Sequence, residues 1–139
     1  MTRRSRGREV ALQLLFQRDH NGKINRSALE QFVNDRLAEA SIRQFCLSLY
    51  DGVVANLKDI DIKLSASAEN WRLSRMTTVD RNVLRMGAFE LLHTKDTPAA
   101  VAFDEAIELA RRYGTAESSA FVNGVLDRLK REASVVLGA

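Results

Sequence analysis

Hydrophobic residues recur along almost the whole chain with the 3.6-residue period of α-helices. No stretch alternates between polar and apolar residues for long enough to make a β-strand. The third segment is long enough for one bent helix or for two helices in line. The segments with helical period are residues 7–16, 27–40, 42–64, 79–91, 98–113 and 118–133. The pattern therefore predicts an all-α fold.

Residues that commonly begin or end helices lie at the edges of these segments. Thr77 or Thr78 is expected to cap the helix over residues 79–91, which is apolar over much of its circumference and should be central. Pro98 is expected at the first position of the next helix and Gly114 at its end. Two capping boxes are expected, Ser27 with Glu30 and Ser41 with Gln44.

Three glycines, Gly52, Gly87 and Gly124, fall inside helical segments. A glycine inside a helix costs about 1 kcal/mol relative to alanine. We therefore expect a neighbouring helix to approach closely at each of them.

The length of 139 residues, with 45% hydrophobic residues, suits one globular domain over residues 1–139. Cys46 is the single cysteine, which argues against a disulfide scaffold and for a reducing compartment. The longest apolar run, residues 99–103, is far shorter than the ~20 residues that span a bilayer, and no signal peptide is apparent. A cytoplasmic protein without a membrane segment is expected.

Positive charge is concentrated at the start of the chain. Residues 1–26 carry seven basic and two acidic residues, whereas the rest carries fourteen basic and sixteen acidic residues, for a net charge of +3. A basic arm of about residues 1–8 contains Arg3, Arg4, Arg6 and Arg8. Such an uneven charge distribution points to a polyanionic partner. Nucleic acid is the first candidate, and an acidic membrane surface is the second. A merely solubilising tail is the alternative.

These arginines lie at the beginning of the first helix, where the helix dipole disfavours cations. Residues that break a local structural preference without a structural gain often serve function. Guanidinium groups and free helix N–H groups suit phosphates. Four phosphate contacts to a single strand would give a slope of about −3 for the logarithm of the binding constant against the logarithm of the salt concentration, which we call the salt slope. Gln13 and Phe16 lie within reach to contact bases, although Phe16 could equally flank the core. Trp71 is expected to pack within an apolar connector.

Motifs for catalysis are missing from the sequence. It has no glycine-rich phosphate loop, no paired-cysteine metal motif and no His-Glu-x-x-His. Asp104, Glu105 and Glu108 are better explained as the acidic start of a helix. We therefore expect no enzymatic activity, no catalytic residue, no metal site and no cofactor.

Nearly the whole chain resembles one known family. The segments that carry the resemblance are residues 3–9 (RRSRGRE), 11–17 (ALQLLFQ), 71–73 (WRL), 79–85 (VDRNVLR), 89–92 (FELL), 104–110 (DEAIELA), 113–114 (YG) and 121–127 (FVNGVLD). They are similar to the N-utilisation substance B (NusB) transcription antitermination factors. Two positions depart from the family pattern: Ala120 replaces a basic residue of some members, and Phe16 replaces a commoner tyrosine.

The resemblance implies a compact bundle of about six or seven helices in two small halves, without enzymatic activity. Members of this family pair with the ribosomal protein NusE and bind the boxA element of nascent RNA. Their complex joins elongating RNA polymerase and suppresses termination, notably in ribosomal RNA operons. By this resemblance the arginines and Phe16 contact RNA, with Glu117, Ser118 and Phe121 in a second RNA-binding loop. Asp80 and Arg81 correspond to positions near the NusE contact.

Three alternatives remain open from the sequence. The chain could be a helical adaptor whose basic arm docks onto an acidic protein. It could be a relative of the NusB-like RNA-binding domain of RNA cytosine methyltransferases. A homodimer that covers the RNA-binding surface is also conceivable.

Overall fold

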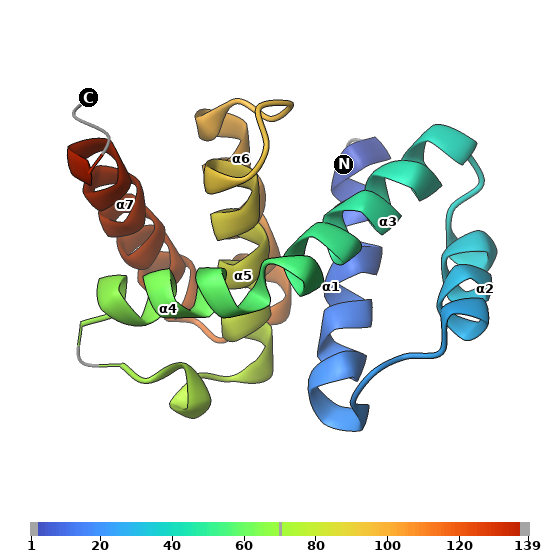
Figure 1. The fold of residues 1–139 in the computed structure, drawn as a ribbon, viewed down its shortest axis with the longest axis horizontal. Helices are drawn as coiled ribbons and strands as arrows, with labels where there is room; N and C mark the ends of the chain where they lie inside the picture. The colour runs from blue at the N-terminus through green and yellow to red at the C-terminus, as the bar shows by residue number, and fades with distance from the viewer. Residues whose placement is uncertain (1–2, 70, 137–139) are drawn as a thin grey trace.

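The computed structural model describes residues 3–69 and 71–136, with side chains described as far as residue 133. This part of the chain is entirely helical apart from connecting loops, and it contains no strand (Figure 1). The prediction of an all-α fold is therefore confirmed. The helices are α1 (Arg3–Asn21), α2 (Arg26–Arg36), α3 (Ala40–Ala55), α4 (Leu57–Ser67), the short 3₁₀ helix η1 (Leu73–Arg75), α5 (Thr78–Leu92), α6 (Ala99–Tyr113) and α7 (Ser118–Val136).

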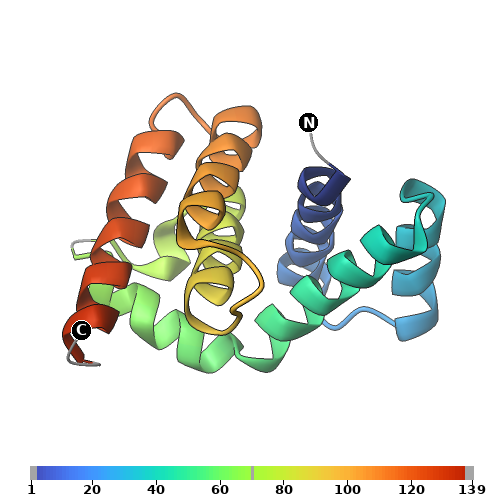
Figure 2. The same cartoon turned by 90° about the horizontal axis from the view of Figure 1, so that it is seen from above.

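The helices form two halves, α1 to α3 and α4 to α7, which Figures 1 and 2 show side by side. Helices α3 and α4 run nearly end to end and connect the halves. The break between them lies at Asn56, whose side-chain amide donates a hydrogen bond to the Gly52 carbonyl over 2.8 Å. Helix α5 contacts α1, α3, α4, α6 and α7. The prediction that it is the central helix is confirmed.

One hydrophobic core runs through both halves. It joins Val10 and Leu14 of α1 to Val83 of α5 and Leu126 of α7, all fully buried. Cys46 lies in the same core as a free thiol, and burial raises its pKa to about 12. None of the described helices combines the length and apolar character needed to cross a membrane.

Close packing at the helical glycines differs from site to site. A side chain at Gly52 would collide with the Phe89 ring, and one at Gly87 would meet Leu126. No atom lies within 4 Å of the position where a side chain of Gly124 would begin. The predicted close approach is confirmed at the first two glycines and wrong at Gly124.

The capping boxes are wrong, because both helices begin earlier than predicted. Asn25 caps α2 by accepting a hydrogen bond from the Ala28 N–H over 3.2 Å, so Ser27 lies inside the helix. Helix α3 begins after Glu39, which makes no side-chain cap, and Ser41 is therefore also helical.

The caps at the other helices follow the sequence more closely. Thr77 accepts a hydrogen bond from the Asp80 N–H over 3.1 Å and caps α5. Pro98 precedes α6 directly instead of occupying its first turn, and Gly114 follows the last residue of that helix. Thr77 and Gly114 thus confirm the predicted start of α5 and end of α6.

Candidate nucleic-acid and partner interface

The first three arginines of the chain project from an ordered helix. Helix α1 begins at Arg3, whose side chain is 78% exposed and pairs with Glu39 over 3.2 Å. The guanidinium of Arg4 lies over the Phe45 ring, 4.7 Å from its centroid. The side chain of Arg6 is 43% exposed. Exposed ion pairs contribute little to stability, so Arg3 can exchange Glu39 for a phosphate at small cost.

Arg8 differs from its neighbours because it is buried, with 2% of its surface exposed. It donates two hydrogen bonds of 2.8 Å to the carboxylate of Glu90, which also accepts one from Thr97. Burial alone would lower the pKa of Arg8, but the hydrogen bond and charge of Glu90 outweigh burial and raise the pKa. Arg8 therefore binds Glu90 inside the protein through its Nε and Nη2 atoms, and its contact with RNA stays a prediction.

Gln13 and Phe16 line a groove of about 550 Å³ along α1, which we call the α1 groove. Phe16 is 41% exposed and is therefore not a core residue. Its ring lies 4.5 Å from that of His20. The groove also brings in residues that the sequence did not single out. These further lining residues are Glu9, Leu12 and Gln17 of α1, Phe32 and Arg36 of α2, Val79 of α5, and Tyr113 of α6.

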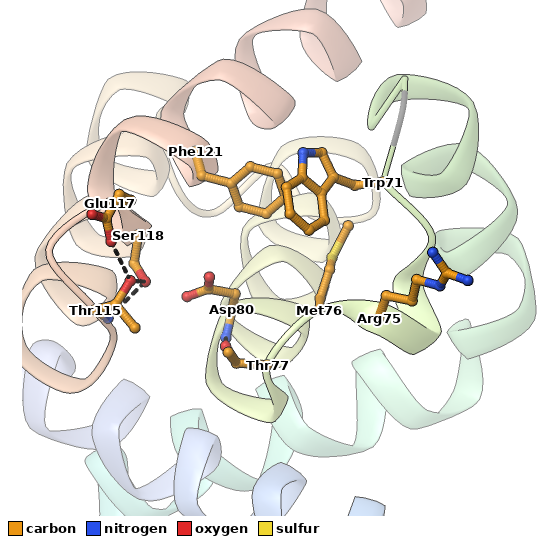
Figure 3. A pocket seen from close by; sticks show the side chains of 9 residues that line it. All are labelled: Trp71, Arg75, Met76, Thr77, Asp80, Thr115, Glu117, Ser118 and Phe121. Carbon is orange, nitrogen blue, oxygen red and sulfur yellow. Dashed lines mark hydrogen bonds between the residues drawn. The ribbon is translucent and has the colours of Figure 1, made fainter.

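A second pocket of about 340 Å³, the η1 pocket, lies between η1, the start of α5 and the loop before α7 (Figure 3). It brings together Asp80, Glu117, Ser118 and Phe121, which the sequence assigned to two different surfaces. The other lining residues are Trp71, Arg75, Met76, Thr77 and Thr115. Predicted RNA-binding and partner-binding residues therefore share one pocket.

Trp71 contributes an exposed aromatic surface to the η1 pocket. It is 55% exposed, and its ring meets that of Phe121 edge to face at 5.8 Å. The expectation that Trp71 packs within a connector is therefore wrong. Hydrophobicity alone did not indicate this exposure, because an aromatic residue in a short connector can face either way.

Asp80 and Ser118 are buried at this pocket in different ways. Ser118 accepts a hydrogen bond from the Thr115 N–H over 2.9 Å and thereby holds the loop before α7 in shape. Asp80 is 9% exposed, and its Oδ1 atom has no hydrogen-bond partner among the described residues. An unsatisfied buried oxygen costs about 1–3 kcal/mol, so a bound donor would stabilise Asp80.

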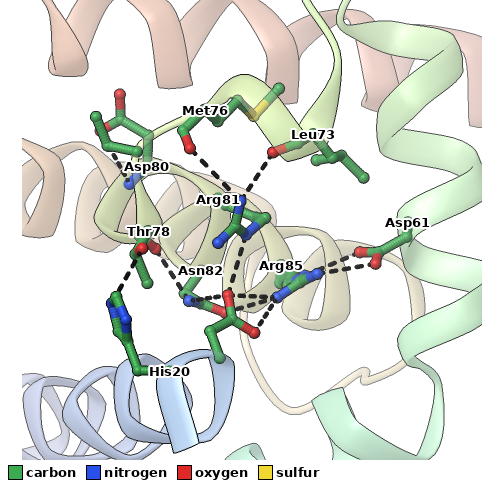
Figure 4. Close-up of polar contacts among 11 residues, drawn as sticks. His20, Asp61, Leu73, Met76, Thr78, Asp80, Arg81, Asn82 and Arg85 are labelled. Atoms are coloured by element: carbon green, nitrogen blue, oxygen red, sulfur yellow. Dashed lines mark hydrogen bonds and ion pairs between the residues drawn. The ribbon is translucent and has the colours of Figure 1, made fainter.

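Arg81 belongs to an internal polar network and does not line the η1 pocket (Figure 4). Its guanidinium donates to Asp19 of α1 and to the Leu73 carbonyl of η1, each over 3.0 Å. Arg85 joins the same Asp19 to Asp61 of α4. These bonds fix η1 and α1 against α5, so Arg81 positions the wall of the pocket.

The charges in this network favour the ionised form of Asp19. Burial would raise the pKa of this carboxyl group. The charge of Arg85 and hydrogen bonds from Asn82 and Arg81 oppose burial and hold the pKa below its ordinary value. The network is therefore intact when Asp19 is deprotonated.

Comparison with known proteins gives consistent matches over almost the full length. The model of the NusB family matches residues 5–131. The transcription antitermination protein NusB of Sorangium cellulosum (strain So ce56) is 45% identical over 129 residues, which cover 93% of this chain and 92% of that protein. The solved structure of T. maritima NusB is 40% identical, with a TM-score of 0.82, and the match covers 95% of this chain and 92% of that one.

A further solved structure is similar in fold. It contains the antitermination factors NusB and NusE in complex with dsRNA, and the match has a TM-score of 0.85 at 24% identity. This match covers 95% of the present chain and 98% of the other. At this level of identity, the likeness concerns the arrangement of the helices.

Proposed function

The chain belongs to the NusB family, and on this premise we propose that it is a transcription antitermination factor. It binds boxA-type single-stranded RNA together with NusE and joins the antitermination complex on elongating RNA polymerase, notably in ribosomal RNA operons. It acts in the cytoplasm and by binding alone, without catalysis.

The observation that carries the RNA-binding part is that arginines at the start of α1 precede an exposed aromatic groove on the same helix. Arg3, Arg4 and Arg6 lie at the positive end of α1, where free helix N–H groups and guanidinium groups both attract phosphates. The α1 groove follows directly on the same helix with Gln13 and Phe16. Bases that are not paired can stack on such a ring while an amide reads their edges.

The partner-binding part rests on Asp80. Asp80 lines the η1 pocket, where its carboxylate can accept a hydrogen bond or a positive charge from a protein such as NusE. Glu117, Ser118 and Phe121 border the same pocket and complete the RNA-binding surface beside it. We propose that Asp80 receives the partner directly and that Arg81 holds Asp80 in place.

The experiment is a titration of boxA RNA and a scrambled oligonucleotide at ~150 mM salt, with and without NusE. We expect preference for boxA in the presence of NusE. The double variant Arg4→Gln/Arg6→Gln should bind at least roughly tenfold more weakly, because a hydrogen bond to a charged group is worth 1.5 kcal/mol or more. The salt slope should shrink by about 1.4 for two lost phosphate contacts to a single strand.

A matched control is Arg131→Gln, which removes an exposed arginine that pairs with Asp127 on α7. It changes the net charge without touching α1 and should leave binding unchanged. Equal affinity for boxA and the scrambled RNA, even with NusE present, would instead favour the helical adaptor. RNA binding that depends only on net charge would favour a solubilising role for the arginines.

A further inference from the structure

Arg36, at the end of α2, lines the α1 groove and lies over an aromatic ring. Its guanidinium carbon is 3.4 Å from the centroid of the Phe32 ring, one helical turn earlier. At this separation a guanidinium turned edge-on would push its nitrogen atoms into the ring, so its plane follows the plane of the ring. One Nη atom also donates a hydrogen bond to the Phe32 carbonyl over 3.2 Å. The ring and the carbonyl together hold the guanidinium in one orientation.

The positive charge of Arg36 is not used by an acidic neighbour. The two acidic residues nearest to it in the sequence have other partners, since Asp35 accepts a hydrogen bond from Gln31 and Glu39 pairs with Arg3. Within the part of the chain that the structure describes, no carboxylate forms an ion pair with the Arg36 guanidinium. This arginine is therefore available to a ligand.

The remainder of the α1 groove suits a flat ring more than a charged group. Its lining is mainly apolar and aromatic, with two glutamine amides. Glu9 is the one acidic residue among the described residues that line it. Glu9 is 4% exposed and accepts a hydrogen bond from the Tyr113 hydroxyl, so it presents little of its carboxylate to the groove.

A guanidinium that is already stacked on a ring is a good platform for a base. Unpaired RNA bases stack on arginine planes as well as on aromatic rings. Phe32 covers one face of the Arg36 guanidinium, and the exposed side chain leaves the other face for a ligand. Because its orientation is fixed before binding, little conformational freedom is lost when a base arrives.

We propose that Arg36 is a base-binding residue, and that the guanidinium face opposite Phe32 stacks on an unpaired base of the RNA strand. The groove then contacts bases from α2 as well as from α1, where Phe16 lies. This inference rests on the proposed RNA-binding function and adds α2 to its surface.

A conservative substitution separates stacking from charge. Arg36→Lys keeps a positive charge in the last turn of α2, where the helix dipole favours it, but removes the flat guanidinium. Arg36→Ala removes both the charge and the plane. The matched control is Arg131→Lys, which makes the same substitution at an exposed arginine that pairs with Asp127 on α7 and lies outside the groove.

The experiment measures boxA binding by the full chain with NusE at several salt concentrations. Arg36→Lys and Arg36→Ala should each weaken binding by about fivefold or more, as expected when a base loses its stacking partner. The salt slope should stay at the wild-type value in both variants, because no phosphate contact is lost. Arg131→Lys should change neither the affinity nor the slope.

A second measurement locates the stacked base. RNAs with one abasic nucleotide at successive positions each lack a single base but keep every phosphate. At the position that contacts Arg36, the wild type should lose its advantage over Arg36→Lys, because neither complex can form the stack. A difference that persists at every position would contradict stacking by Arg36.

The outcomes separate this inference from the function on which it rests. If Arg4→Gln/Arg6→Gln weakens boxA binding but Arg36→Lys does not, stacking by Arg36 is wrong and the proposed function stands. Wild-type affinity of Arg36→Lys with a slope reduced by about 0.7 in Arg36→Ala would show a phosphate contact and overturn stacking. Loss of NusE binding, with RNA binding by the isolated chain unchanged, would assign the groove to the protein partner and also overturn it. If the wild-type protein shows no preference for boxA, the proposed function itself fails.

Discussion

Arg8 and Glu90 form a buried, two-pronged ion pair, with both hydrogen bonds at 2.8 Å. The pair joins the first turns of α1 to the end of α5. Thr97, just before α6, donates a third hydrogen bond to the same carboxylate. One arginine of the basic run therefore anchors the helix from which Arg3, Arg4 and Arg6 project.

Glu90→Gln distinguishes an anchor from a phosphate ligand by the sign of its effect. If Arg8 anchors α1, the variant should bind boxA more weakly, because the exposed arginines lose their fixed position. If Arg8 were a phosphate ligand, removing its carboxylate partner would strengthen binding. We also expect a loss of about 3 kcal/mol in the free energy of unfolding, since breaking a buried pair leaves an unpaired charge. Urea denaturation and boxA titration measure the two quantities.

The control for this variant is Glu39→Gln, which removes the partner of the exposed Arg3. An exposed pair contributes at most about 1 kcal/mol, so stability should barely change. RNA binding should stay equal or increase slightly, because Arg3 loses a competing anion. Stronger binding by Glu90→Gln than by the wild type would contradict the anchoring role of Arg8.

Acid should weaken the network around Asp19. Because the pKa of Asp19 is lowered in the folded protein, its contribution is complete above the ordinary value of roughly 3.9 and is lost as the pH falls through the folded pKa. Asp19→Asn should therefore lower the free energy of unfolding by about 2 kcal/mol at pH 7, and this difference should shrink below about pH 4. Urea denaturation at several pH values tests this.

Asp35→Asn is a suitable comparison, because Asp35 is an exposed carboxylate that accepts a hydrogen bond from Gln31. Its effect on stability should be small at every pH. A difference between the wild type and Asp19→Asn that stays constant from pH 7 to pH 3 would contradict the assigned linkage.

Cys46 should resist alkylation in the native protein. Its side chain is fully buried, and its pKa of about 12 leaves very little thiolate at neutral pH. Labelling by iodoacetamide therefore requires the core to open, and we expect it to be roughly 10³-fold or more slower than in urea. Mass spectrometry gives an unambiguous count because the chain has one cysteine. Rapid labelling without denaturant would show that the core around α3 opens more readily than its packing indicates.

Much of the fold was predictable because hydrophobic period and end signals act locally. The central position of α5, its cap at Thr77 and the end of α6 at Gly114 all follow from residues within a few positions of each other. The NusB resemblance, confirmed by the family match, was visible from the same segments. The choice between one helix and two over residues 42–64 was not predictable, because the hydrophobic period continues through the break at Asn56.

The candidate site was harder to predict because its properties depend on partners distant in sequence. Arg8 resembles Arg6 in the sequence, but its buried partner Glu90 lies 82 positions away. Arg81 donates a hydrogen bond to Asp19, which lies 62 positions away in the sequence. The roles of Gln13, Phe16, Glu117 and Phe121 in RNA binding, and the extent of the single domain, stay predictions.

Two glycines that look alike in the sequence should respond to alanine with opposite signs. At Gly52, the added methyl group would collide with the Phe89 ring, and overpacking of this kind costs about 1–3 kcal/mol. That cost exceeds the gain of about 1 kcal/mol from helix propensity. Gly124 is exposed within α7 and has no atom in the way, so the propensity gain should appear undiminished. Thermal and urea unfolding should therefore show Gly52→Ala below and Gly124→Ala above the wild type. Two stabilised variants would mean that Phe89 moves aside freely and that the contact between α3 and α5 is looser than the structure indicates.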